Sequence, residues 1–212
     1  MKKTLIASAL LTASVALSSA VTTATVRNFT SPTAGLPILD NTGTPIRGSY
    51  AVGFYASDFD FVGSTGEQVR DGITQFGSEL NSFVFDGLIG APNSTSANIP
   101  KEGGSPFTGN DVFVLFGDQD TLASSTLFGV VRLGTQFQNE NDADLGTVDA
   151  TITGATATVE YGFLVSPSAQ PSGPVAFNFA EGLQLSAVGI PEPSTSLLAA
   201  LAGLGLVARR RR

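Results

Sequence analysis

Hydrophobic and polar residues alternate along much of this 212-residue chain, which is rich in Gly, Thr, Ser, Val and Phe. Every second residue from Ala157 to Phe163 is apolar, which is the period of a β-strand with one buried face. Residues 112–116 are apolar throughout, which is typical of a central strand covered on both faces. Strands are therefore predicted over 25–30, 49–57, 82–89, 111–117, 126–133, 147–153, 155–165 and 175–188, the last broken near Glu181.

One stretch follows the period of a helix instead, because its apolar residues recur at steps of four, three, four and three. These residues are Val69, Ile73, Phe76, Leu80 and Phe83. Thr65 and Gln68 fit a capping box, in which a hydroxyl and an amide satisfy the first N–H groups of a helix. Gly72 and Gly77 each weaken a helix by about 1 kcal/mol relative to Ala. The pattern predicts one amphipathic helix over 66–80, whose apolar side packs on a sheet.

The first twenty residues have the pattern of a secretory signal peptide. Lys2 and Lys3 provide a positive start, residues 5–17 are mostly apolar, and small residues precede Ala20. Cleavage is predicted after Ala20, with Ala24 as the alternative site. The competing interpretation is a helix of a cytosolic protein.

The last residues combine an apolar run over 197–208 with a basic cluster. The large apolar side chains of the run are Leu197, Leu198, Leu201, Leu204, Leu206 and Val207. As a helix the run would span about 18 Å of a hydrocarbon core about 30 Å thick. The basic cluster, Arg209, Arg210, Arg211 and Arg212, is expected to stay on the cytoplasmic side. The segment therefore predicts a hydrophobic helix held in the inner membrane until it is processed; the alternatives are a stable single-span anchor and a core helix with a basic cap.

The order of these features, with Pro191, Glu192, Pro193 and Ser194 before the apolar run, resembles the PEP-CTERM sorting signal of Gram-negative bacteria. The same type of tail has been catalogued on some ice-binding proteins. The resemblance implies export, recognition by the membrane enzyme exosortase, and cleavage near residues 191–193. It also implies a place at the cell surface or in an exopolysaccharide or biofilm matrix.

The chain is thus divided into a signal peptide (1–20), a β-rich exported domain (21–190) and the sorting signal (191–212). About 170 residues are enough for one domain with its own core. The predicted fold is all-β, an antiparallel, jelly-roll-like β-sandwich with one helix near 66–80. A signal helix and a hydrophobic helix are expected at the two ends.

Charge and composition exclude several functions. The exported domain keeps five basic residues against seventeen acidic ones, so its net charge is 5 − 17 = −12. A surface this acidic repels nucleic acid, which is not expected as a partner. The chain has no Cys and no His, which removes disulfides, the commonest metal ligands and the usual nucleophile–base pairs. No enzyme activity and no cofactor other than calcium are therefore predicted.

The best candidate ligand is Ca²⁺, because residues 139–144 place five oxygen-bearing side chains in six positions. The predicted ligands are Asn139, Asn141, Asp142 and Asp144, with Asp118 and Asp120 as further candidates from another turn. The alternative is an acidic turn that only contacts solvent. Residues 91–110 are predicted to form a long polar surface loop.

Two functions remain for the exported domain. The first is a structural or adhesive role in the matrix, and the second is a non-catalytic carbohydrate-binding module, with calcium as a possible aid. Carbohydrate binding needs exposed aromatic rings, and Tyr55, near Asp58 and Asp60, is the candidate. The partners expected on these grounds are signal peptidase, exosortase, the inner membrane and an extracellular polysaccharide.

Overall fold

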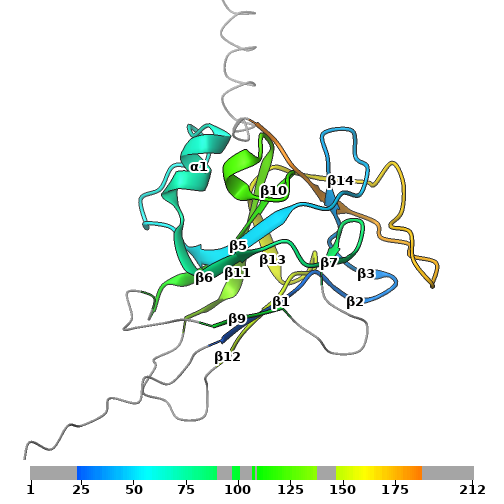
Figure 1. Ribbon diagram of the computed structural model, residues 1–212, viewed down its shortest axis with the longest axis horizontal. Helices are drawn as coiled ribbons and strands as arrows, with labels where there is room; N and C mark the ends of the chain where they lie inside the picture. Colours follow the sequence, from blue (N-terminus) through cyan, green and yellow to red (C-terminus); the bar gives the residue numbers. More distant parts are fainter. Residues whose placement is uncertain (1–22, 90–96, 101–106, 108, 138–146, 188–212) are drawn as a thin grey trace, which may run out of the picture.

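A five-stranded antiparallel sheet forms the centre of this computed structural model, which describes residues 23–89, 97–100, 107, 109–137 and 147–187 (Figure 1). Its strands lie in the order β13 (Ala157–Tyr161), β11 (Phe128–Gln136), β10 (Asp111–Gly117), β5 (Ser49–Phe54) and β6 (Thr74–Leu80). The middle strand, β10, is buried from its second residue to its last. This agrees with its unbroken run of apolar residues, and the all-β prediction is confirmed.

Shorter strands form the remaining sheets. One sheet holds β12 (Thr147–Thr151), β1 (Thr23–Arg27) and β9 (Ala97–Pro100), and another holds β14 (Phe163–Val165), β15 (Gly182–Gln184) and β4 (Ile38–Leu39). Two hairpins pair β2 (Phe29–Ser31) with β3 (Ala34–Gly35) and β7 (Phe83–Phe85) with β8 (Leu88–Ile89). A single turn of 3-10 helix spans Leu122–Ser124.

Two of the strand pairings are parallel, which differs from the predicted antiparallel arrangement. They join β1 with β12 and β15 with β4. Each pair brings together strands that lie far apart in the sequence, so no hairpin connection imposes the antiparallel direction. The other pairings among the described strands are antiparallel.

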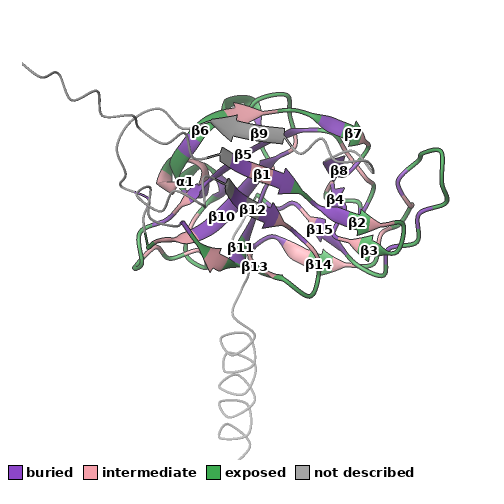
Figure 2. Cartoon of the chain, turned by 90° about the horizontal axis from the view of Figure 1, so that it is seen from below, coloured by how far each residue is buried: buried purple, intermediate pink, exposed green. Residues whose placement is uncertain are grey.

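The central sheet packs on apolar side chains at both of its faces. Its middle strand, β10, is accordingly drawn as largely buried in Figure 2. On one face, Val114 and Phe116 belong to the larger cluster, which also includes Val26 of β1 and Ala150 of β12. On the other face, Leu115 belongs to a second cluster, which also includes Val69 of the helix over Gly66–Gly72. Successive residues of β10 thus enter opposite cores, as the alternation of side chains along a strand requires.

The predicted helix over 66–80 is correct only in its first half. The helix α1 spans Gly66–Gly72, and both hydrogen bonds of the capping box between Thr65 and Gln68 are present. Residues 74–80, however, form β6, which pairs with β5. A spacing of four places Phe76 and Leu80 on one side of either a helix or a strand, so this spacing does not distinguish the two.

Two further predictions are corrected along the chain. The loop predicted over 91–110 contains the strand β9. This strand pairs with β1 through main-chain hydrogen bonds and forms one edge of that sheet. The predicted strand over 49–57 ends at Phe54, and Asp58 and Asp60 lie in the following turn rather than on a strand. A turn at residues 154–156 separates β12 from β13, in agreement with the two separate strands predicted over 147–153 and 155–165.

The side chain of Asn28 joins three separate segments inside the protein. It is completely buried, and its amide nitrogen donates to the carbonyl oxygens of Leu36 (3.0 Å) and Gly87 (2.7 Å). Its amide oxygen accepts from the N–H of Ile89 at 2.7 Å. The residue ends β1 and divides the predicted strand over 25–30 into β1 and β2. Asn28 is therefore a structural residue whose hydrogen bonds are made by main-chain groups distant in sequence.

Asp118 closes the turn between β10 and β11. Its carboxylate accepts hydrogen bonds from the main-chain N–H groups of Thr126 (2.7 Å) and Leu127 (3.0 Å) and from the side chains of Thr126 and Gln119. Burial raises the pKa of this carboxyl, but the hydrogen bonds from Leu127, Thr126 and Gln119 outweigh it and leave the pKa below its ordinary value of 3.8.

We expect Asp118 to make the stability of the protein depend on pH in the acidic range. Because its pKa is lower in the folded state, its contribution is complete above the unfolded pKa and disappears as the pH falls through the folded one. Urea unfolding between about pH 6 and pH 2 should therefore show a smaller loss of stability for Asp118→Asn than for the unchanged protein. Parallel curves for the two proteins would contradict this assignment.

The last described residues are tied to the rest of the fold by main-chain hydrogen bonds. The predicted strand over 175–188 is a strand only at Gly182–Gln184, after the break expected near Glu181. Beyond it, Ser186 exchanges two hydrogen bonds of 2.8 Å with Phe128, and the carbonyl of Ala187 accepts from Gly66 at 3.2 Å. The fold therefore continues to Ala187, where it meets the start of α1.

None of the helices in the described part of the chain is long and apolar enough to cross a membrane. The apolar run over 197–208 and the predicted signal peptide lie outside the described residues.

Candidate functional site

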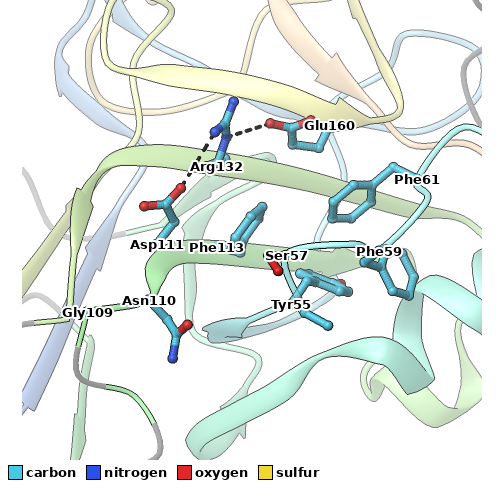
Figure 3. Close-up of a pocket in the computed structure, with 11 residues that line it drawn as sticks. Tyr55, Ser57, Phe59, Phe61, Gly109, Asn110, Asp111, Phe113, Arg132 and Glu160 are labelled. Carbon is cyan, nitrogen blue, oxygen red and sulfur yellow. Dashed lines mark hydrogen bonds and ion pairs between the residues drawn. The ribbon is translucent and has the colours of Figure 1, made fainter.

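An open cleft of about 430 Å³ lies on the face of the central sheet that also packs on α1 (Figure 3). One side of the cleft is formed by the loop that follows β5, with residues 55–61. The other side is formed by residues 109–113 at the start of β10 and by Arg132 and Glu160 from β11 and β13. The cleft is thus built from one loop and three neighbouring strands.

Aromatic rings form the first side of the cleft. Phe61 stacks on Phe113, with ring centroids 5.9 Å apart and an interplanar angle of 27°. Tyr55 and Phe59 each approach Phe61 in a T-shaped arrangement at 4.8 Å. Phe113 and Tyr55 are buried, whereas Phe59 and Phe61 are partly exposed. The two partly exposed rings can therefore contact a ligand while the buried ones support them.

A row of charged side chains forms the second side. The Nε atom of Arg132 lies 2.7 Å from Oε1 of Glu160, and its Nη1 atom lies 3.6 Å from Oδ2 of Asp111. Oδ1 of Asp111 also accepts a hydrogen bond of 3.0 Å from the side chain of Gln136. Figure 3 shows Arg132 between the two carboxylates. One cation thus pairs with two anions on three adjacent strands.

Strand register brings these charges together. Arg132 lies opposite Phe113 on β10 and opposite Thr158 on β13, and Asp111 lies opposite Gln136. Asp111 and Phe113 both line the cleft, although the register between β10 and β11 shifts between them. The arginine therefore lies beside the aromatic rings as well as between the carboxylates.

The loop carrying the rings is held by a local turn. Oδ1 of Asp60 accepts hydrogen bonds of 3.0 Å from the main-chain N–H groups of Val62 and Gly63. An aspartate in this role fixes a turn around its own backbone. The Tyr55 hydroxyl donates to the carbonyl of Val69 at 3.0 Å and links the loop to α1. Phe59 and Phe61 are therefore presented by an ordered loop.

This arrangement fits a ligand that has both an apolar face and several polar groups. Ring faces attract C–H groups through dispersion and their negative quadrupole. Carboxylates accept hydrogen bonds from hydroxyls, and a guanidinium donates to oxygen. Sites for small ligands commonly combine an apolar lining with a few polar groups of this kind.

The residues predicted as sites from sequence are only partly placed by the structure. The calcium candidates Asn139, Asn141, Asp142 and Asp144 lie outside the described residues. Within the described ranges, no three His, Cys, Asp or Glu side chains gather in a way that could hold a metal ion. Tyr55 was expected to be exposed, but it is only 4% exposed, because its ring packs under Phe59 and Phe61.

Sequence reasoning missed the residues that surround Tyr55. Phe59 and Phe61 flank Asp60, and a pair of aromatic residues in a polar, turn-forming stretch is a usable signal of partly exposed rings. Arg132 interrupts the apolar run of β11, which marks a charged side chain at an exposed position of that strand. The sequence does not show that its partners are Asp111 and Glu160.

Comparison with known families finds one match, at the end of the chain. The PEP-CTERM protein-sorting motif matches residues 189–212, in agreement with the resemblance noted in the sequence. No curated protein and no solved structure matches the chain. The motif includes the Pro191–Glu192–Pro193 sequence, the apolar run and the arginine cluster. The chain therefore carries a PEP-CTERM protein-sorting motif, which implies an exported protein that is processed by an exosortase.

Proposed function

We propose that the exported domain is a structural or adhesive protein of the cell surface or extracellular matrix, which holds polysaccharide in the aromatic cleft without cleaving it. The observation that carries this proposal is the pairing of partly exposed rings, Phe59 and Phe61, with a row of hydrogen-bonding side chains across one open cleft. A pyranose ring offers C–H groups on its faces and hydroxyls at its rim, so it can contact both sides at once.

The route to that place follows from the two ends of the sequence. A signal peptide over 1–20, cleaved after Ala20, directs the chain across the inner membrane of a Gram-negative host. The run over 197–208 holds it there, with Arg209 to Arg212 on the cytoplasmic side, until the exosortase acts. The sorting motif supports this order of events.

The packing supports a two-layer architecture for the exported domain. The larger core lies between the central sheet and the strands β1 and β12, which is the arrangement of a β-sandwich. The cleft lies on the other face of the central sheet and combines one loop with residues of three strands.

Replacing Phe61 with alanine is expected to weaken retention of polysaccharide by about three- to tenfold, because a stacking face of about 1 kcal/mol is lost. The measurement is co-sedimentation of the full-length protein with exopolysaccharide from the host. Phe85→Ala is the matched control, since Phe85 is also a partly buried phenylalanine but packs in another cluster, on Phe177. Equal retention by Phe61→Ala and the unchanged protein would show that the cleft does not hold the polysaccharide. Repeating the assay with Ca²⁺ and with a chelator tests whether calcium assists.

A further inference from the structure

We infer that the cleft selects neutral sugars and rejects acidic ones, so that its ligand is an uncharged hexose chain rather than a polyuronate or a sulfated or phosphorylated polysaccharide. This inference rests on the proposed function and specifies the substrate class of the same cleft. It depends on how the charges of the cleft are arranged.

The charged side of the cleft carries more negative than positive charge. Arg132 contributes one positive charge, and Asp111 and Glu160 contribute two negative ones, so the row has a net charge of 1 − 2 = −1. Arg132 is already bound to both carboxylates, at 2.7 and 3.6 Å, and therefore cannot pair with an anionic sugar without giving up a partner. An isolated arginine would attract a carboxylate, but this one is neutralised before a ligand arrives.

The rest of the domain strengthens this effect. Its net charge of 5 − 17 = −12 produces a negative potential around the cleft, which lowers the local concentration of anionic polymers. Asp58 stands between two lining residues, Ser57 and Phe59, in the sequence and carries a charge of the same sign. The remaining described arginines are elsewhere, and two of them pair with Asp86 and Asp71.

The same side chains are suited to hydroxyl groups. Arg132 and Asp111 have side chains that are 44% and 39% exposed, so a ligand in the cleft can reach them. Carboxylate oxygens accept hydrogen bonds from sugar hydroxyls. The ion pairs described for Arg132 use its Nε and Nη1 atoms, and a guanidinium has five N–H donors in all. A neutral sugar thus gains hydrogen bonds without breaking the ion pairs, which an acidic sugar cannot do.

The test compares sugars that differ only in charge. Full-length protein is titrated with oligomers of glucose, mannose and galactose and with the corresponding oligouronates of equal length, at low and high salt. We expect at least one neutral oligomer to bind at least tenfold more tightly than its uronate. We also expect the difference to shrink at high salt, because screening weakens the repulsion.

Charge-neutralising variants identify the residues responsible. Asp111→Asn and Glu160→Gln each bring the row from −1 to 0 and keep an oxygen that can accept a hydrogen bond, so each should reduce the preference for the neutral oligomer several-fold. Asp86→Asn is the matched control, since it also removes one negative charge and one ion pair, with Arg47, away from the cleft. The control should reduce the preference much less than Asp111→Asn does, because its charge acts on the ligand only from a distance.

The outcomes separate the inference from the proposed function. Tighter or equal binding of the uronates by the unchanged protein overturns the inference and leaves saccharide binding intact. A preference that Asp86→Asn reduces as much as Asp111→Asn also overturns it, because selection would then come from overall charge and not from the cleft. Binding of neither kind of oligomer overturns the proposed function itself.

Discussion

Replacing Asn28 with alanine is expected to destabilise the protein by about 2–6 kcal/mol, since two buried main-chain groups lose the partner that the side chain supplies and each costs about 1–3 kcal/mol. The groups are the carbonyl of Leu36 and the N–H of Ile89, whereas the carbonyl of Gly87 keeps a hydrogen bond of 2.9 Å from the N–H of Ile38. A loss of this size is a large part of the 5–15 kcal/mol that typically separates folded and unfolded states. The measurement is urea unfolding followed by circular dichroism.

A second replacement separates hydrogen bonding from shape. Asn28→Asp keeps the size of the side chain and the acceptor for Ile89, but it loses both donors and faces two carbonyl oxygens. It should destabilise at least as much as Asn28→Ala, because a buried charge that accepts from one N–H and faces two carbonyl oxygens is costly. Thr33→Ala, at an exposed position of the neighbouring turn, serves as control and should stay within about 0.5 kcal/mol of the unchanged protein. A loss below about 1 kcal/mol for Asn28→Ala would show that water replaces the side chain.

Replacing Phe76 with alanine should destabilise the protein by about 3–5 kcal/mol, the usual range for removing a buried ring. Phe76 is 1% exposed, stacks on Phe137 at 5.4 Å and meets Phe107 at 5.2 Å in a T-shaped contact. The rings come from separate parts of the chain, so the space that is left cannot collapse by a local movement alone. Thermal and urea unfolding both measure this loss.

The neighbouring residue provides the control for Phe76. Gln75 is exposed on the same strand, and Gln75→Ala should change the stability by less than about 0.5 kcal/mol. Phe76→Leu should fall between the two, because it keeps much of the apolar volume. Similar values for Phe76→Ala and Gln75→Ala would mean that residue 76 does not face the core.

The sequence predicted the central strands well, because their pattern reflects burial directly. The unbroken apolar run at 112–116 identified β10, and alternation identified β13. The start of the helix was also predictable, since a capping box between Thr65 and Gln68 is a local signal. The end of the helix was not, because Phe76 and Leu80 fit both periods and pairing with β5 decided between them.

Other features depend on contacts that no local pattern contains. The short strands around Asn28 are held by hydrogen bonds between positions up to 61 residues apart. The cleft requires Arg132 to meet Glu160, 28 residues later, and Asp111, which depends on the register of three strands. The aromatic side of the cleft could have been predicted from Phe59 and Phe61 in the sequence. The burial of Tyr55 against these two rings follows only from packing.

The hydrogen bonds that end at Ala187 determine how the domain would carry a pulling force. A load applied through the segment that precedes the sorting motif first reaches the contact between Ala187 and Gly66 and the paired bonds between Ser186 and Phe128. Phe128 begins β11, the strand that also carries Arg132, so the load passes directly into the central sheet. Tension applied at this end would therefore pass to the strand that carries one of the residues lining the cleft.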